Sequence, residues 1–271
     1  MEEYIFYAGL SGLTFLILII LLIVICIKEK NTFNKFFLIL LCISEMFNCI
    51  PKFLQIFRKD EKVDILCYLQ VLFSLTSDIG TLTTTTLMSI KACDDYLNNG
   101  DFFKKKRNQN FLKIINIVFP FIFFFFIFFR KSYDNQCWVK GFYSNLFIYI
   151  IFWILILTNF GFLYFVICEL CKMRKQYKEF EKDLLEEGNL SIKSEKLRSK
   201  KISGKLYENY IYSIIIPLIW VYFTFSRLKQ MKKEEEEKDI FMEIHMFISS
   251  GRGIIYVLIY LINNIYIKCI K

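Results

Sequence analysis

Apolar segments of about 20 residues, separated by short polar and mostly basic stretches, recur along the whole chain. A helix of about 20 residues, rising about 1.5 Å per residue, crosses the hydrocarbon layer of a membrane, and irregular backbone cannot. We therefore predict an all-α polytopic membrane protein, a seven-transmembrane helix bundle forming a single domain over residues 1–271. The predicted spans are Tyr4–Ile27, Asn34–Phe57, Ile65–Lys91, Phe111–Phe129, Phe142–Cys168, Leu206–Phe225 and Glu243–Ile267.

The composition supports this class and excludes others. Apolar residues make up 55% of the 271 residues, above the roughly 45–50% of a soluble domain, yet 23% are charged and the net charge is +9. Because apolar and charged residues are segregated along the chain, the pattern excludes a soluble enzyme domain, a disordered chain and a disulfide-rich secreted domain. We expect a multi-pass protein of the plasma membrane, in contact with membrane lipid and without a nucleic-acid partner.

The distribution of Lys and Arg predicts the orientation. If the N-terminus lies outside, the inner loops and C-terminus carry 21 basic residues and the outer side carries 11. The acidic start Met1–Glu3 and the basic segment Lys28–Lys30 agree with that assignment. We therefore expect an outside N-terminus and a cytoplasmic C-terminus.

The long third inner loop, residues 172–205, holds 11 basic and 6 acidic residues. Its first part has apolar residues at steps of three and four, which predicts that the fifth span continues as a helix into this loop. These apolar positions are Tyr177, Phe180, Leu184 and Leu185.

Most of the nine cysteines lie in or beside predicted spans, where cysteine acts as a small apolar side chain. Cys168 and Cys171 are spaced like half a zinc site, but a second half is missing and His245, the only histidine, falls on the opposite side of the membrane. We therefore expect no metal site and no cofactor.

Two cysteines fall on the predicted outer face, where a disulfide can persist. Cys67 begins the third span, and Cys137 lies in the loop between the fourth and fifth spans. A bridge between them would fix the second outer loop over the mouth of the bundle. This arrangement resembles the one found across G-protein-coupled receptors.

Local matches extend that resemblance to one family, the cyclic-AMP receptors of slime moulds and other protists. Their order and spacing match over nearly the whole chain, although Ile265 stands where the family has Pro after its Asn pair. The matching positions are Pro51, Cys67-Tyr68-Leu69, Cys137-Trp138-Val139, Asn209-Tyr210-Ile211, Trp220, Ile244-His245, Ser249, Gly253 and Asn263-Asn264.

The resemblance implies a G-protein-coupled receptor rather than an enzyme. Such a receptor senses an extracellular small-molecule ligand, here cyclic AMP or another small anion, and activates a heterotrimeric G protein. The G-protein contacts would come from the third inner loop, and attraction of this loop to anionic lipid is the other interpretation. The basic residues that we expect to make these contacts are Arg174, Lys175, Lys200 and Lys201.

Three predicted spans carry an internal charge. Counted from the outer helix ends, Glu45, Asp78 and Arg252 lie roughly 18, 20 and 14 Å deep, so they can share one layer. A charge at mid-membrane is costly and normally finds a partner inside the bundle. Arg252 either grips the phosphate of a ligand or pairs with Asp78 or Glu45 as an internal strut, and a ligand that breaks such a pair would combine both roles. Trp138 is either part of a lid over this ligand site or an ordinary interfacial tryptophan.

A second class of function uses the same charges. A small polytopic transporter or channel would place Glu45, Asp78 and Arg252 at a permeation or proton-coupling site. The sequence lacks the inverted repeat typical of many transporters, which favours the receptor.

Overall fold

The computed structural model describes residues 2–28, 32–57, 65–97, 101–128, 142–187, 212, 214–226 and 240–270. Within these residues the chain is all-helical and contains no strand. The helices are α1 (Glu2–Lys28), α2 (Thr32–Phe57), α3 (Ile65–Leu97), α4 (Asp101–Lys104), α5 (Lys106–Phe128), α6 (Phe142–Glu187), the helix Ile214–Ser226 and α8 (Ile240–Ile270).

Five of the described helices are long and apolar enough to cross a membrane. The protein is therefore a multi-helix membrane protein, as its composition predicts. The apolar helix Ile214–Ser226 is shorter, and α5 covers most of the predicted fourth span. The five membrane-length segments are Ile5–Lys28, Asn34–Phe57, Ile65–Asp95, Phe147–Phe165 and Glu243–Ile262.

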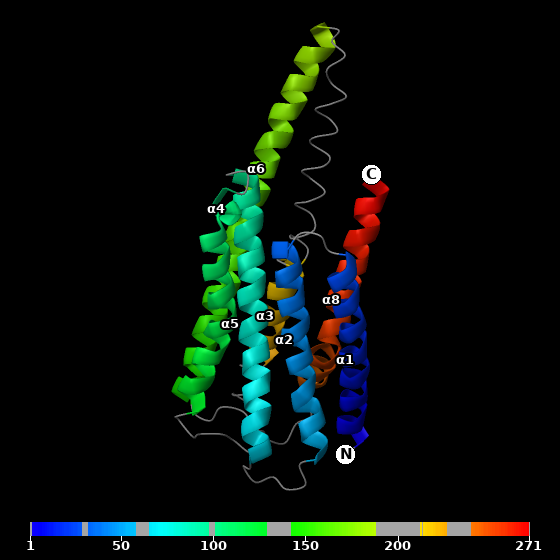
Figure 1. Ribbon diagram of the computed structural model, residues 1–271, viewed down its shortest axis with the longest axis vertical. Coiled ribbons are helices and arrows are strands. Elements are labelled where there is room, and N and C mark those ends of the chain that lie inside the picture. Colours follow the sequence, from blue (N-terminus) through cyan, green and yellow to red (C-terminus); the bar gives the residue numbers. More distant parts are fainter. Residues whose placement is uncertain are drawn as a thin grey trace.

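The helices are arranged as a ring. Helix α1 packs between α2 and α8, α2 also contacts α3 and α8, and α3 continues the ring to α6 while holding α5 on its other side. Helix Ile214–Ser226 joins α6 to α8: Trp220 meets Phe152 of α6 with ring centroids 5.0 Å apart, and Phe223 meets His245 of α8 at 4.4 Å. The two chain termini lie at opposite ends of the bundle (Figure 1).

Burial differs from that of a protein that folds in water, because large apolar side chains cover the outside of the bundle and charged groups lie inside an otherwise mostly apolar core. Large aliphatic side chains of α1 such as Leu16, Ile20 and Ile23 are exposed, as are many on α6 and α8, whereas the interior contains Arg252 and Glu45. Exposed apolar faces on several helices suit a lipid environment, and polar groups buried among them must find partners inside the ring.

Small residues allow the helices that carry these polar groups to approach closely. A Cβ atom on Gly253 of α8 would lie 2.6 Å from Thr14 Cγ2 and 2.8 Å from Leu18 Cδ1 of α1. On Gly80 of α3 it would lie 2.7 Å from Ser44 Oγ of α2. Both contacts bring the backbones of neighbouring helices together, as small residues do in membrane bundles.

Helix α6 confirms the predicted helical extension beyond the fifth predicted span, as far as Glu187. It runs for 46 residues, from Phe142 to Glu187. Its last 22 residues, after the membrane-length segment, add about 33 Å at 1.5 Å per residue. In Figure 1 this part projects beyond the bundle at the end where the C-terminus lies.

Candidate functional site

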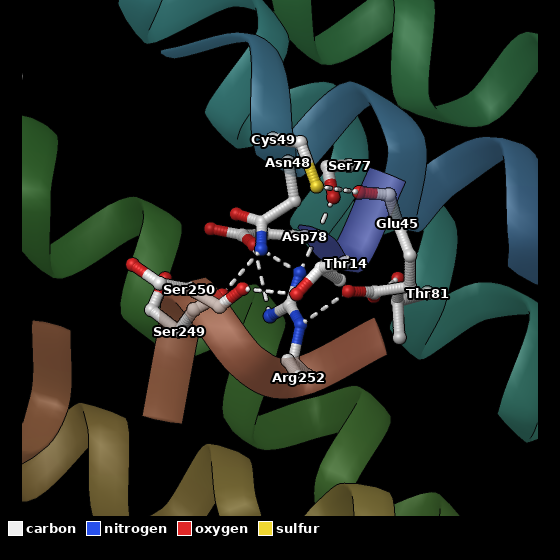
Figure 2. Close-up of polar contacts among 10 residues, drawn as sticks. All are labelled: Thr14, Glu45, Asn48, Cys49, Ser77, Asp78, Thr81, Ser249, Ser250 and Arg252. Atoms are coloured by element: carbon white, nitrogen blue, oxygen red, sulfur yellow. Dashed lines mark hydrogen bonds and ion pairs between the residues drawn. The ribbon is translucent and has the colours of Figure 1, made fainter. Parts of the chain in front are cut away.

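Arg252 of α8 lies at the centre of a buried cluster with α2 and α3 (Figure 2). Its Nε donates to Glu45 Oε2 at 2.8 Å, and both of its terminal nitrogens donate to Asp78 Oδ1 at 3.2 Å. The second terminal nitrogen also donates to Ser77 Oγ at 3.2 Å. The structure therefore brings together the three charges that the sequence predicted to share one layer, and Arg252 pairs with both carboxylates.

The two carboxylates differ in how firmly they are held. Glu45 has a completely buried side chain, and its second oxygen accepts a 2.8 Å hydrogen bond from Thr81 Oγ1. Asp78 has a side chain that is 13% exposed, and its hydrogen bonds from Arg252 all reach Oδ1. We call the bond from Arg252 to Glu45 the Glu45 arm and the bonds from Arg252 to Asp78 the Asp78 arm. The Glu45 arm is shorter and its carboxylate is less exposed, and both Glu45 oxygens accept a hydrogen bond.

Two aromatic rings of the helix Ile214–Ser226 lie on one side of the guanidinium, with their centroids 5.5 Å apart. The Arg252 Cζ atom lies 5.1 Å from the Trp220 ring centroid and 6.0 Å from that of Phe223. A cation over an aromatic face is stabilised by the ring quadrupole, most strongly where water is excluded. The cluster therefore connects four helices: α2, α3, α8 and Ile214–Ser226.

A row of polar side chains leads from the cluster along α2 towards the C-terminal end of this helix. Glu45, Asn48 and Lys52 are spaced three and four residues apart, so they lie on one face of this helix. Asn48 Nδ2 donates to the Ser249 carbonyl of α8 at 2.8 Å, and Lys52 Nζ donates to the Met246 thioether at 3.7 Å. Each step towards the C-terminal end of α2 thus meets an earlier residue of α8, as expected for antiparallel neighbours.

A cavity of about 60 Å³ opens beside the cluster, enough for a few water molecules. Its wall combines charged and polar groups with an aromatic face, and it receives residues from five helices. The lining residues are Asn48, Lys52, Ser74, Asp78, Tyr149, Phe152, Trp220, Phe223, Thr224, His245, Ser249 and Arg252.

One cavity group has an unmet hydrogen-bonding requirement. The Trp220 side chain is buried, with only 4% of the residue exposed, and its indole nitrogen has no acceptor among the described residues. Buried polar groups normally have a partner, so an acceptor in the cavity would complete this site.

A second polar cluster lies nearer the C-terminal end of α3 than the Arg252 cluster does. Asn159 of α6 donates to Thr86 Oγ1 at 2.6 Å and accepts from Ser89 Oγ at 2.7 Å, and Asn116 of α5 donates to Thr84 Oγ1 at 3.1 Å. We call these residues the Asn159 cluster. Because α3 contributes to both clusters, it connects the Arg252 site to the helix that extends beyond the bundle.

The C-terminal end of α3 is held by charged side chains. Lys91, though buried, forms an ion pair with Asp95 one turn further on, and Asp94 accepts a 3.1 Å hydrogen bond from the Phe103 backbone N–H. This bond fastens the short helix α4 against the end of α3. This hydrogen bond and the Lys91–Asp95 ion pair explain why α3 continues beyond Lys91, the last residue of the predicted third span.

Several of the other predicted site residues lie outside the described part of the chain. Cys67 is completely buried at the start of α3, but Cys137 and Trp138 lie outside the described residues, so the disulfide stays a prediction. Arg174 and Lys175 lie in the extended part of α6, whose side chains there are not described, and Lys200 and Lys201 also fall outside the described part of the chain. Among the described residues, no group of His, Cys, Asp and Glu is placed to hold a metal ion.

In comparisons with known proteins, no protein-family model and no curated protein matches the chain.

Proposed function

We propose that the protein is a seven-transmembrane receptor of the G-protein-coupled class that senses a small extracellular ligand. The observation that carries the proposal is the unequal pairing of Arg252: a buried arm to Glu45 and a more exposed arm to Asp78, beside a cavity. A receptor needs an interaction that its ligand can alter, because a ligand shifts a conformational equilibrium only through different affinities for the two states. The Asp78 arm supplies such an interaction.

The ligand enters the cavity from the outer face, where the N-terminal end of α1 lies in the proposed orientation. It competes for the polar groups around Asp78 and weakens the bond from Arg252 to Oδ1, while the Glu45 arm keeps α2 and α8 together. Loosening this arm weakens the connection between α3 and α8 and leaves the hydrogen bond from Arg252 to Ser77. Trp138 and a Cys67–Cys137 disulfide would cover the cavity from the second outer loop.

The signal then passes along α3 to the Asn159 cluster. Asn159 binds α6 to α3 through two hydrogen bonds, so a shift of α3 changes the position of α6. The extended part of α6 carries this change beyond the membrane, where Arg174 and Lys175, with Lys200 and Lys201, contact a heterotrimeric G protein.

Cyclic AMP is the first ligand to test, because the sequence resembles its receptors. Membranes with wild-type protein should bind it saturably, and Arg252→Ala should abolish binding at equal surface expression. Asn34→Ala, near the start of α2 and 11 residues before Glu45, serves as a polar control. No binding by well-expressed wild-type protein would remove cyclic AMP as the ligand.

A transporter would give a different result in the same system. Wild-type protein in sealed vesicles would accumulate the bound ligand, and Asp78→Asn would change the uptake rate. A receptor instead binds the ligand without accumulation and stimulates guanine-nucleotide exchange on the G protein.

A further inference from the structure

We propose that the cavity beside Arg252 binds the polar edge of an amino-substituted heterocycle. Asp78 accepts a hydrogen bond from the amino group, and Trp220 donates one to the adjacent ring nitrogen. This inference rests on the proposed function, and it names the part of the ligand that enters the cavity and its first contacts. The adenine ring of cyclic AMP has such an edge, because its exocyclic amino group lies beside ring nitrogens that accept hydrogen bonds.

The Trp220 indole N–H is a buried donor that lacks an acceptor. The residue is 4% exposed and lines the cavity, and its Nε1 has no hydrogen-bond partner among the described residues. An indole nitrogen can only donate, and an unpaired buried donor is destabilising. A ligand atom that accepts from this N–H therefore gains a hydrogen bond for which no described residue competes.

Contacts with three other residues hold the Trp220 ring in one orientation. Its centroid lies 5.1 Å from Arg252 Cζ of α8 and 5.0 Å from the centroid of the Phe152 ring of α6. The Phe223 ring, on the same helix as Trp220, packs against it in a T-shaped arrangement with the centroids 5.5 Å apart. Rotation of the indole towards another acceptor would give up these contacts, so the N–H is pre-organised for a ligand.

Asp78 supplies an unused acceptor in the same cavity. The hydrogen bonds that it accepts from Arg252 reach Oδ1, and its Oδ2 accepts none from the described residues. Its side chain is 13% exposed, so a ligand donor can reach this oxygen. Because Arg252 contacts both Asp78 and Trp220, the unused acceptor and the unused donor lie beside the same guanidinium.

This combination of one donor and one acceptor selects the ligand group. A phosphate oxygen could accept from Trp220, but Asp78 would repel it, and Arg252 is already outnumbered by two carboxylates. An ammonium group could bind Asp78 but offers Trp220 no acceptor. An uncharged edge with an N–H beside a ring nitrogen satisfies both residues. The aromatic rings in the cavity wall favour a flat heterocycle over an isolated hydroxyl group.

The cavity admits an edge of the ligand rather than the whole of it. Its volume of about 60 Å³ holds a few water molecules, so the ribose and phosphate of cyclic AMP would remain outside. The amino group then competes with Arg252 for Asp78. This competition is the change that the proposed receptor mechanism requires.

A matched pair of small heterocycles tests the proposal on purified full-length protein. 9-Methyladenine carries the amino group, and 9-methylpurine lacks only that group; both are uncharged near neutral pH. The readout is the unfolding temperature, which rises when a ligand binds the folded state. We expect a saturable rise with 9-methyladenine. With 9-methylpurine the midpoint should need at least about tenfold more ligand, because Asp78 then has no donor to accept.

Two variants separate the donor from the acceptor. Trp220→Phe keeps a ring over Arg252 but removes the N–H, so it should raise the midpoint concentration at least about tenfold for both heterocycles. Asp78→Asn should raise it for 9-methyladenine alone, because Arg252 can donate only to the amide oxygen and the amide NH₂ then faces the ligand amino group.

Trp153→Phe on α6 is the matched control, because Trp153 packs on Phe225 and is a described residue outside the cavity lining. It should keep the wild-type midpoint for 9-methyladenine. Unfolding temperatures without added ligand show whether each variant is folded.

The proposal is overturned if wild type shows no saturable shift with 9-methyladenine. It is also overturned if Trp220→Phe keeps the wild-type midpoint, as it would if a water molecule satisfied the indole. Because binding is measured without a G protein, it can succeed where signalling fails. 9-Methyladenine binding that requires Trp220, with no effect of any ligand on G proteins, would refute the proposed receptor alone. A G-protein response to cyclic AMP that Trp220→Phe leaves unchanged would refute only this assignment of the cavity.

Discussion

Arg252 and Glu45 are joined by a 2.8 Å hydrogen bond from Nε to Oε2, and both side chains are almost completely excluded from solvent. The partner carboxylate, Asp78, is 3.2 Å from the guanidinium and partly faces a cavity. One arm therefore fastens α2 to α8, and the other can respond to what the cavity contains.

Removing the Glu45 arm should destabilise the fold more than removing the Asp78 arm. Glu45→Ala leaves Arg252 with one weaker partner and Thr81 without its acceptor, and breaking a buried pair costs about 3–5 kcal/mol. Asp78→Ala should cost less, because its side chain is more exposed and makes longer bonds. Unfolding of the two purified variants in the same detergent measures the difference, and an equal or reversed order would contradict it.

Close packing of α8 on α1 should make Gly253 intolerant of a side chain. Gly253→Ala places a Cβ atom 2.6 Å from Thr14 Cγ2, so the helices must separate, at a cost of about 1–3 kcal/mol. Gly161→Ala on α6 is the matched control, because its Cβ would meet nothing within 4 Å and alanine favours the helix. Thermal unfolding should lower the midpoint for the first variant alone; equal midpoints would show that α1 and α8 pack less tightly than described.

The Asn159 cluster should hold α6 in place. Asn159→Leu keeps much of the side-chain volume but leaves Thr86 and Ser89 without their α6 partner. We expect faster limited proteolysis of the α6 extension in membranes. Thr158→Val, whose hydroxyl bonds only within α6 to Ile154 O, is the neighbouring control. Indistinguishable cleavage rates for the two variants would rule out the cluster as the tether of α6.

If the predicted disulfide forms, replacing either of its two cysteines should have the same effect. Cys67→Ala and Cys137→Ala should each reduce surface expression to a similar extent, and the double variant should be no worse than either, because one bond is lost in every case. Cys42→Ala, a buried free cysteine of α2, controls for the loss of a core thiol. Normal expression and ligand binding by both single variants would show that no such bond is needed.

Helix periodicity explains which parts of this site were predictable. Counting 1.5 Å per residue gives depth, so Glu45, Asp78 and Arg252 could be assigned to one layer from the sequence. Depth does not give the direction in which each helix faces, so the choice between a strut and a ligand contact needed the helix arrangement. Lys52 was missed as a site residue, although its spacing from Glu45 and Asn48 already placed it on their face of α2.

Helix ends were less predictable for a related reason. Composition marks where a helix leaves the hydrocarbon layer, not where its hydrogen bonding stops. Helix α3 continues from Lys91 to Leu97 because the Lys91–Asp95 pair neutralises the buried charge, and α5 begins at Lys106, ahead of the predicted start at Phe111. The apolar steps after Met173 did predict the α6 extension, because they carry the helical period.

The most direct test of the central claim is guanine-nucleotide exchange in membranes that express the protein together with heterotrimeric G proteins. Weakening the Asp78 arm without a ligand should imitate activation, so Asp78→Asn should raise basal exchange several-fold over wild type at equal surface expression. Ser74→Ala, which changes another cavity residue of α3, should remain at the wild-type level. Exchange by Asp78→Asn that equals exchange in membranes lacking the protein, with or without added ligand, would contradict the receptor mechanism.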